Sequence, residues 1–148
     1  MAYVIDTQAY LDTVVELLRS GHDHVPVTVA GTSMCPFLYP DDVVFLDPLT
    51  KPAAPGDIVL FTRPDGKYVL HRIIACCSDG SYRLLGDNQI RPERVSDASH
   101  LHAIVSCAKI RGRIVTPKHI RWWFFRSVWR KFIRLRIWCG RLSGHKLP

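Results

Sequence analysis

The sequence predicts a mainly β domain, an antiparallel and partly closed sheet with a helix near each end of the chain. Short runs rich in Val, Ile, Leu and Phe recur between turn residues, as in all-β domains. The two outer stretches instead show helical spacing of their apolar residues. We divide the 148 residues into an N-terminal helix and linker (1–24), a β-rich body (25–116) and a basic tail (117–148).

The first helix is expected from Asp6 or Thr7 to Ser20, where apolar residues form one stripe and Gly21 provides a stop. Turn chemistry separates the runs that follow, most clearly at the hairpin signal 63–66, Arg-Pro-Asp-Gly. A polar loop is expected from the Gly-Asp-Asn turn to Ser99. The expected strands are 25–30, 42–46, 57–61, 67–76, 82–85 and 101–115, the last with Gly112 as a bend or bulge.

The net charge of +7 comes from the tail. Residues 1–116 hold 11 Lys and Arg against 13 Asp and Glu, a balance of −2, whereas residues 117–148 hold 9 basic residues and no acid. Residues 1–21 carry Asp6, Asp12, Glu16 and Arg19, so we expect neither a signal peptide nor a membrane span there.

Metal binding and disulfides are not favoured by the pattern of His and Cys. The five cysteines are odd in number and lack CxxC spacing, so we expect reduced, mostly buried thiols. The spacing of His22 and His24 could suit a metal, but no third ligand lies near them in sequence, and a solvated loop is favoured. We predict no metal and no cofactor.

The tail predicts an amphipathic helix from Pro117 to Gly140. Its aromatic side chains and arginines suit an anionic membrane surface. A helix docked on the body or on another protein is the alternative, and single-stranded nucleic acid is less favoured because the body adds no basic surface. The expected membrane-binding residues are Trp122, Trp123, Phe125, Trp129, Phe132, Arg126, Arg130 and Arg134.

A candidate nucleophile is Ser33, in the turn Gly31-Thr32-Ser33-Met34-Cys35-Pro36 that follows the first β-like run. His71 could act as its general base. Behind the histidine, Asp87 is the first choice of acid and Glu93 the second. The backbone N–H of Ser33, helped by that of Thr32 or of the preceding glycine, would stabilise an oxyanion.

Four motifs follow one another in the sequence: the serine turn, Pro-Gly-Asp-Ile-Val-Leu-Phe (55–61), Leu-His-Arg-Ile-Ile (70–74) and Gly-Asp-Asn (86–88). In order and spacing they resemble the successive boxes of the type I signal peptidases, over roughly residues 25–115. Histidine in place of the usual bacterial lysine resembles the endoplasmic-reticulum and archaeal branch. The resemblance implies Ser33 as nucleophile, His71 as base and a β-domain shared with LexA-like self-cleaving proteins.

The resemblance also implies a substrate, an extended signal or leader peptide that pairs as an added strand and is cut after small residues, commonly alanine. The chain departs from the family in lacking an N-terminal span and in having Gly31 where many bacterial members have serine. We therefore expect membrane attachment through the C-terminal helix. The rival hypothesis is a non-enzymatic LexA-like regulatory or dimerisation domain whose basic tail contacts nucleic acid.

Overall fold

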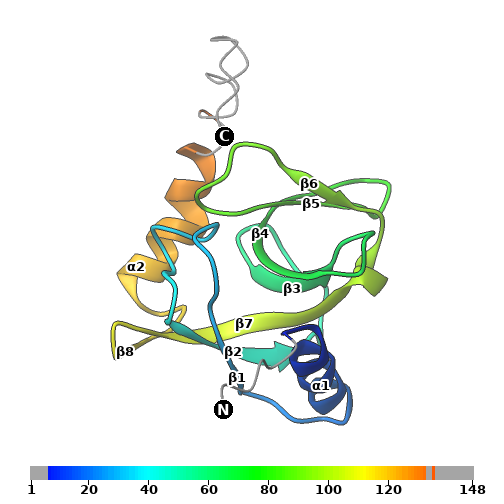
Figure 1. The fold of residues 1–148 in the computed structure, drawn as a ribbon. Coiled ribbons are helices and arrows are strands. Elements are labelled where there is room, and N and C mark those ends of the chain that lie inside the picture. Colours follow the sequence, from blue (N-terminus) through cyan, green and yellow to red (C-terminus); the bar gives the residue numbers. More distant parts are fainter. Residues whose placement is uncertain (1–6, 133–134, 136–148) are drawn as a thin grey trace.

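The computed structural model describes residues 7–132 and residue 135 (Figure 1). One sheet of eight strands runs in the order β1-β2-β7-β3-β4-β5-β6, with β8 paired to β7, and every pairing is antiparallel. The mainly β fold with flanking helices is confirmed. The strands are β1 (Val25–Thr28), β2 (Val43–Pro48), β3 (Ile58–Thr62), β4 (Tyr68–Cys76), β5 (Tyr82–Leu85), β6 (Glu93–Val95), β7 (Leu101–Ile110) and β8 (Arg113–Val115).

Two apolar clusters lie on opposite faces of β3 and β4. Alternate residues of a strand point to opposite faces, and β3 follows this rule. Ile58 and Leu60 belong to the larger cluster, which also contains buried residues of both terminal helices. Val59 and Phe61 belong to a second cluster with residues of β4, β5 and β7. In the first half of β4, Tyr68 and Leu70 pack against the larger cluster, whereas Val69 packs against the second.

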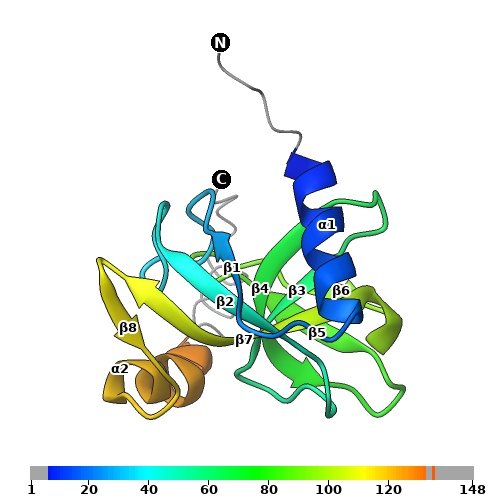
Figure 2. The same cartoon turned by 90° about the horizontal axis from the view of Figure 1, so that it is seen from below.

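Helix α1 (Thr7–Arg19) packs on the sheet through Val14, Val15 and Leu18, which recur at helical spacing and are buried. The helix ends near Gly21, whose φ of 94° is the left-handed conformation that glycine adopts without strain. Figure 2 shows α1 on one side of the molecule and the C-terminal helix on the other.

Two features of the sheet differ from the sequence expectation. The run 101–115 is not one bent strand, because Arg111 and Gly112, both at positive φ, form the turn of a hairpin between β7 and β8. The expected polar loop contains the short strand β6, which pairs with β5. Three residues of mixed polarity give too short a pattern to be recognised as a strand.

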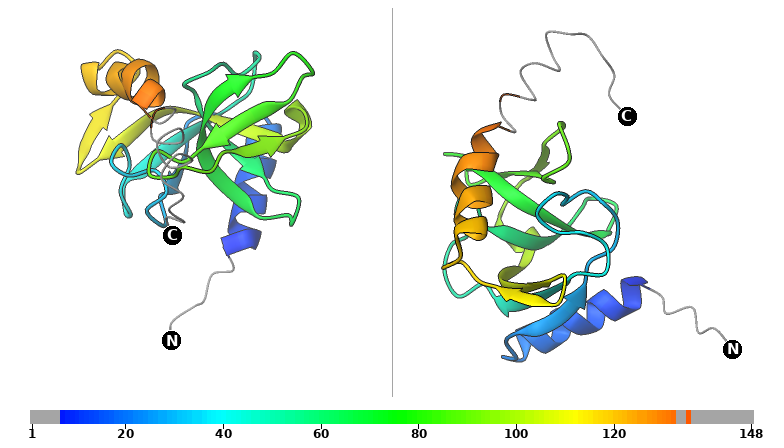
Figure 3. Two further views of the ribbon diagram at one scale, coloured as in Figure 1. Left: turned by 90° about the horizontal axis from the view of Figure 1, so that it is seen from above. Right: turned by 90° about the vertical axis from the view of Figure 1, so that its left-hand side faces the viewer.

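The C-terminal helix begins at Ile120, after the cap residue His119, as α2 (Ile120–Trp123) and continues through a π-helical segment, η2 (Phe124–Trp129). It lies along the side of the body near β8 (Figure 3). The described residues contain no helix that is both long enough and apolar enough to cross a membrane. Arg134 and the expected helical end at Gly140 lie outside the described residues.

Two residues of the expected membrane-binding set are buried against the body. Trp122 and Phe125 are only 4% and 9% exposed and belong to the larger apolar cluster. The half-buried Trp129 packs against the same cluster. Trp123 and Phe132 are exposed. The helix is apolar on more than one side, and the body covers the side that carries the buried aromatics.

Candidate active site

The loop that carries Ser33 is anchored by the side chains that follow it. Met34, Phe37 and Leu38 are buried in the larger apolar cluster. Backbone hydrogen bonds from Phe37 and Leu38 to the Met34 carbonyl fold the loop into a compact turn. Ser33 itself is half-buried, so its hydroxyl is carried by a packed loop without being enclosed by it.

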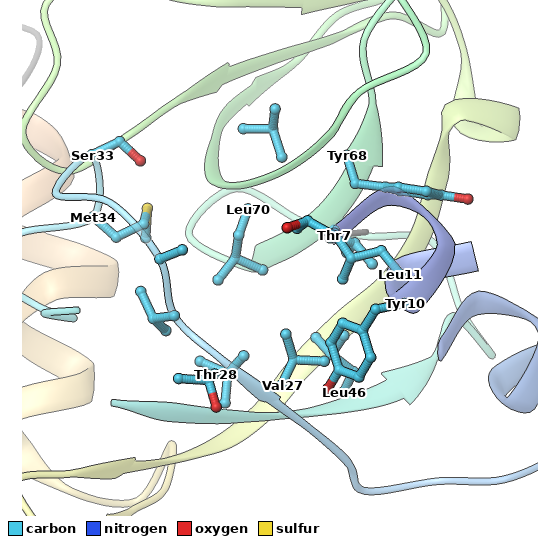
Figure 4. A pocket seen from close by; sticks show the side chains of 15 residues that line it. Thr7, Tyr10, Leu11, Val27, Thr28, Ser33, Met34, Leu46, Tyr68 and Leu70 are labelled. Carbon is cyan, nitrogen blue, oxygen red and sulfur yellow. The ribbon is translucent and has the colours of Figure 1, made fainter. Parts of the chain in front are cut away.

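Ser33 lies at one end of a pocket of about 280 Å³. Figure 4 shows its hydroxyl at one side of the pocket, Leu70 near the middle, and Tyr68 with the α1 residues Thr7 and Tyr10 at the other side. The lining is mostly apolar, as in sites that accept small or aliphatic side chains.

Two strand edges border this pocket. Residues 27–30 line one side in unbroken succession, and residues 68–70 line the other. Because successive side chains of a strand point to opposite faces, a pocket that touches consecutive residues runs along the backbone edge. β1 pairs only with β2 in the described sheet, and β5 pairs with β4 only from Arg72 onward. Both edges can therefore accept an added strand.

His71 leaves β4 on the face opposite to the neighbouring Leu70. Its ring lies 5.9 Å from that of Phe61, between ring centroids, and its side chain is 1% exposed. Burial lowers its pKa to about 4, so the imidazole is neutral at physiological pH. A neutral ring can accept a proton, which is what a general base must do.

The Nδ1 atom of His71 faces Glu93. It lies 3.4 Å from Glu93 Oε1, although the direction makes no hydrogen bond, and Nδ1 has no other partner among the described residues. Arg63 binds both Glu93 oxygens, with Nε 2.6 Å from Oε2, and its hydrogen bond lowers the pKa of Glu93. Glu93, the second choice from sequence, is therefore the ionised acid beside the ring.

Asp87, the first choice, is not beside His71. Its two oxygens accept hydrogen bonds from Arg72 at 2.8 and 2.7 Å, and both residues are fully buried. Burial raises the pKa of the Asp87 carboxyl, and the charge of Arg72 opposes the rise. Arg72 follows His71 in the strand and so points to the other face, which takes Asp87 away from the imidazole.

The backbones that carry Ser33 and His71 meet at the turn 86–88. The Asn88 N–H donates to the Ser33 carbonyl at 2.9 Å, and a Cβ on Gly86 would lie 2.4 Å from the same oxygen. Leu85, just before this turn, pairs with Arg72. The structure thus brings the two segments to one turn, but no hydrogen bond joins the Ser33 hydroxyl to His71 in the described part of the chain.

Backbone donors are available beside the serine. The N–H groups of Thr32 and Ser33 donate no hydrogen bond to any described residue. Such donors can stabilise a developing oxyanion. The nearby thiol of Cys35 has a raised pKa, because of burial and then of Asp42, and so is protonated at neutral pH.

The C-terminal helix holds the serine loop from behind. Arg121 Nη2 donates to the carbonyls of Pro36 at 3.1 Å and Phe37 at 2.9 Å. The indole of Trp122 packs edge-on against Phe37, with ring centroids 5.3 Å apart. Trp129 Nε1 donates to the Asp87 carbonyl at 3.2 Å. One helix therefore supports both the serine loop and the Gly-Asp-Asn turn.

The remaining candidate groups are dispersed. The described residues contain no cluster of three or more His, Cys, Asp or Glu that could hold a metal ion. His24 bonds Asp47 at 2.7 Å, whereas His22 contacts Ser20 at the end of α1. The four described cysteines are free thiols but none is fully buried, and Cys76 is exposed, so the expected burial was wrong.

Comparison with known proteins agrees with this architecture. Residues 2–115 match the family described as Peptidase S24-like. The chain belongs to the Peptidase S24-like family. This family includes LexA-like and signal-peptidase-like proteins, both peptidases and regulators. No curated protein and no solved structure matches the chain significantly. The described part of the C-terminal helix lies beyond the residues that match the family.

Two features of the site were not predicted from the sequence. One is the groove, which is the pocket bordered by the edges of β1 and β4, and the other is the ion pair of Asp87 with Arg72. Tyr68 and Leu70 alternate with His71 along β4, and alternate residues of a strand point to opposite faces. This pattern could have predicted that the pocket and the imidazole lie on different faces of β4. No local signal indicated which cation would pair with Asp87, because that contact crosses from β4 to a turn.

Proposed function

We propose that this S24-like protein is a serine endopeptidase of the signal-peptidase type, which cuts a signal or leader peptide held as an extended strand between β1 and β4. The observation that carries the proposal is the position of Ser33 at the end of a pocket bordered by two open strand edges. Membership of a family that includes serine peptidases supports it.

In the proposed reaction, Ser33 Oγ attacks the scissile carbonyl while His71 Nε2 takes the hydroxyl proton. The N–H groups of Thr32 and Ser33 stabilise the oxyanion, and Glu93 stabilises the imidazolium that forms. The C–N bond then breaks, the proton passes from His71 to the leaving amine, and Ser33 carries the acyl group. Water hydrolyses that ester with the same base.

This reaction needs a contact between Ser33 and His71 that peptide binding must complete. Catalytic hydrogen bonds are commonly long in free enzymes and tighten in the substrate complex. Ser33 contacts this turn at Gly86, and Arg72 pairs with Leu85 beside it, so the proposal requires the serine loop and the segment that carries His71 to move relative to each other at this turn.

The lining of the groove supports a preference for small side chains. Ala30, Met34 and Leu70 line the pocket together with Ser33, and Figure 4 shows Met34 next to the serine. These residues leave an apolar space without a charged partner, which favours alanine at the first and third positions before the cut.

The test is cleavage of an Ala-x-Ala peptide by the full chain, followed by mass spectrometry. Ser33→Ala should abolish cleavage but keep peptide binding, which calorimetry would detect. The matched control is Ser78→Ala, at an exposed turn, which should cleave normally. Normal turnover by the Ser33→Ala variant would disprove the proposal.

A specific observation favours a second candidate, a non-enzymatic regulatory domain that binds a peptide segment. His71 is buried on the face of β4 opposite to the pocket and makes no hydrogen bond to Ser33 within the described residues. The same assay separates the two candidates, because a regulator would bind the peptide in the groove without cutting it.

A further inference from the structure

The C-terminal helix presents apolar side chains on two sides. The body covers one side, where Trp122 and Phe125 are buried and Trp129 packs against the core. The other side carries Ile120, Trp123 and Phe124, which are 82%, 56% and 38% exposed. A helix that is apolar on both sides needs a second partner for the side that the body leaves uncovered.

The surroundings of this uncovered side are cationic. Lys118 and Lys131 are exposed at the two ends of the described helix, and the half-buried Arg121, Arg126 and Arg130 lie between them. No acid occurs anywhere in residues 117–148, which carry nine Lys and Arg. Two of the arginines are engaged with the body, Arg121 with backbone carbonyls and Arg126 with Asp57 at 3.4 Å. The terminal lysines remain directed to solvent.

We infer that the outer side of this helix binds an anionic lipid surface, with Ile120, Trp123 and Phe124 entering the interface and Lys118 and Lys131 facing the head groups. Tryptophan and phenylalanine favour that depth of a bilayer, and each nearby lysine adds electrostatic attraction. The helix stays docked on the body while it binds, because its buried side is part of the core.

Charge argues against the other occupants. If a second copy of the chain bound here, two segments with nine Lys and Arg each and no acidic residue would face each other, and their like charges would repel. Single-stranded nucleic acid would require basic surface continuing onto the body, whereas residues 1–116 have a balance of −2. An anionic bilayer meets the charge and the apolar side together.

The experiment is sedimentation of the full chain with neutral phosphatidylcholine vesicles and with vesicles containing about 30% phosphatidylglycerol. The apolar contact is removed by Trp123→Ser and, separately, by Phe124→Ser. The matched control is Leu17→Ser on α1, because Leu17 has the same 38% exposure as Phe124 but lies on the other side of the molecule. The charge is tested by Lys118→Glu with Lys131→Glu, against the exposed body residue in Lys51→Glu.

We expect strong binding to the anionic vesicles only, loss at about 0.5 M salt, and about a tenfold or larger weakening in each helix variant but in neither control. Binding that is absent, or equal in helix variants and controls, overturns the inference. A dimer abolished by Trp123→Ser would assign the surface to a second copy instead. Retention of single-stranded DNA that the same variant abolishes, without vesicle binding, would assign it to nucleic acid.

Discussion

Arg72 binds both carboxylate oxygens of Asp87 in a fully buried ion pair, although Asp87 is the acid that motif spacing places behind His71. Arg72 also donates to the Gly56 carbonyl at 2.9 Å and lies over the ring of Phe37. The pair therefore ties the Gly-Asp-Asn turn to the loop before β3 and to the serine loop. Its role is to hold the site together.

Removing one partner of this pair should destabilise the fold. Asp87→Asn leaves the buried guanidinium without a counter-charge, and we expect a loss of about 3–5 kcal/mol in the free energy of unfolding. Urea unfolding measures it. The comparison is Asp79→Asn, whose carboxylate pairs with Arg94 at the surface, so its loss should cost far less stability. Equal losses in the two variants would contradict a structural role for the buried pair.

Glu93 should support turnover without supporting the fold to the same degree. Glu93→Gln removes the negative charge beside His71 Nδ1, so the imidazolium of the transition state loses its partner. We expect kcat to fall about tenfold or more with little change in KM. Asp97→Asn, at an exposed cap, serves as the control for carboxylate loss. An unchanged kcat would remove Glu93 from the reaction.

The lowered pKa of His71 predicts a pH dependence of stability. In the unfolded chain the ring binds a proton below about pH 6.5, but in the folded protein only below about 4. Between these values the unfolded state holds more protons, so stability rises with pH and is lost as pH falls, by up to about 3 kcal/mol. Unfolding of the native protein and of His71→Gln at several pH values measures the difference. Parallel curves for the two proteins would contradict the lowered pKa.

The lowered pKa of His71 also predicts that peptidase activity is lost only at a pH well below neutrality. If His71 is the base, kcat/KM should rise through about pH 4 and stay level from about pH 6 to 8. Stopped assays on the Ala-x-Ala peptide give the profile. A limb centred near the ordinary histidine pKa would show that the reactive imidazole is not the buried one.

The C-terminal helix should affect catalysis through the serine loop. Arg121→Gln removes hydrogen bonds to the Pro36 and Phe37 carbonyls, so the loop that carries Ser33 loses its support. We expect kcat to fall about tenfold while KM changes less, because the groove walls are separate from this contact. Arg113→Gln, the same change at an exposed arginine of β8, should behave as the native protein. An increase in KM of similar size, with kcat unchanged, would mean that the helix acts on peptide binding instead.

Gly86 is a position where a methyl group should be costly. An added Cβ would lie 2.4 Å from the Ser33 carbonyl oxygen, so Gly86→Ala must move the serine loop or the turn. We expect about 1–3 kcal/mol of destabilisation and a severe loss of activity. Calorimetric unfolding and the peptide assay measure both. Native activity in this variant would show that the approach of the two backbones is not needed.

Much of the fold was predictable because turn residues and apolar runs are local signals. The hairpin around Gly66 and the strand at Tyr82 appear where the sequence predicts them. The three-residue strand at Glu93 was missed, since its pairing with Leu84 depends on a neighbour rather than on its own pattern.

The candidate site was less predictable than the fold. Motif spacing identified Ser33, His71 and Glu93 as candidates. It could not decide whether Asp87 or Glu93 lies beside His71, because that depends on the ion pair between Asp87 and Arg72 of β4. The C-terminal tail was likewise only partly predictable from the sequence. Helical periodicity identified the aromatic residues, whereas only the packing of Trp122 against Phe37 shows which side faces the body.

The most direct measurement is covalent trapping of the full chain with a peptidyl phosphonate ending in Ala-x-Ala, followed by peptide mapping. The proposal predicts one adduct per chain, on Ser33, with labelling reduced about a hundredfold or more in His71→Gln. Absence of an adduct on Ser33, or equal labelling with and without His71, would contradict the account.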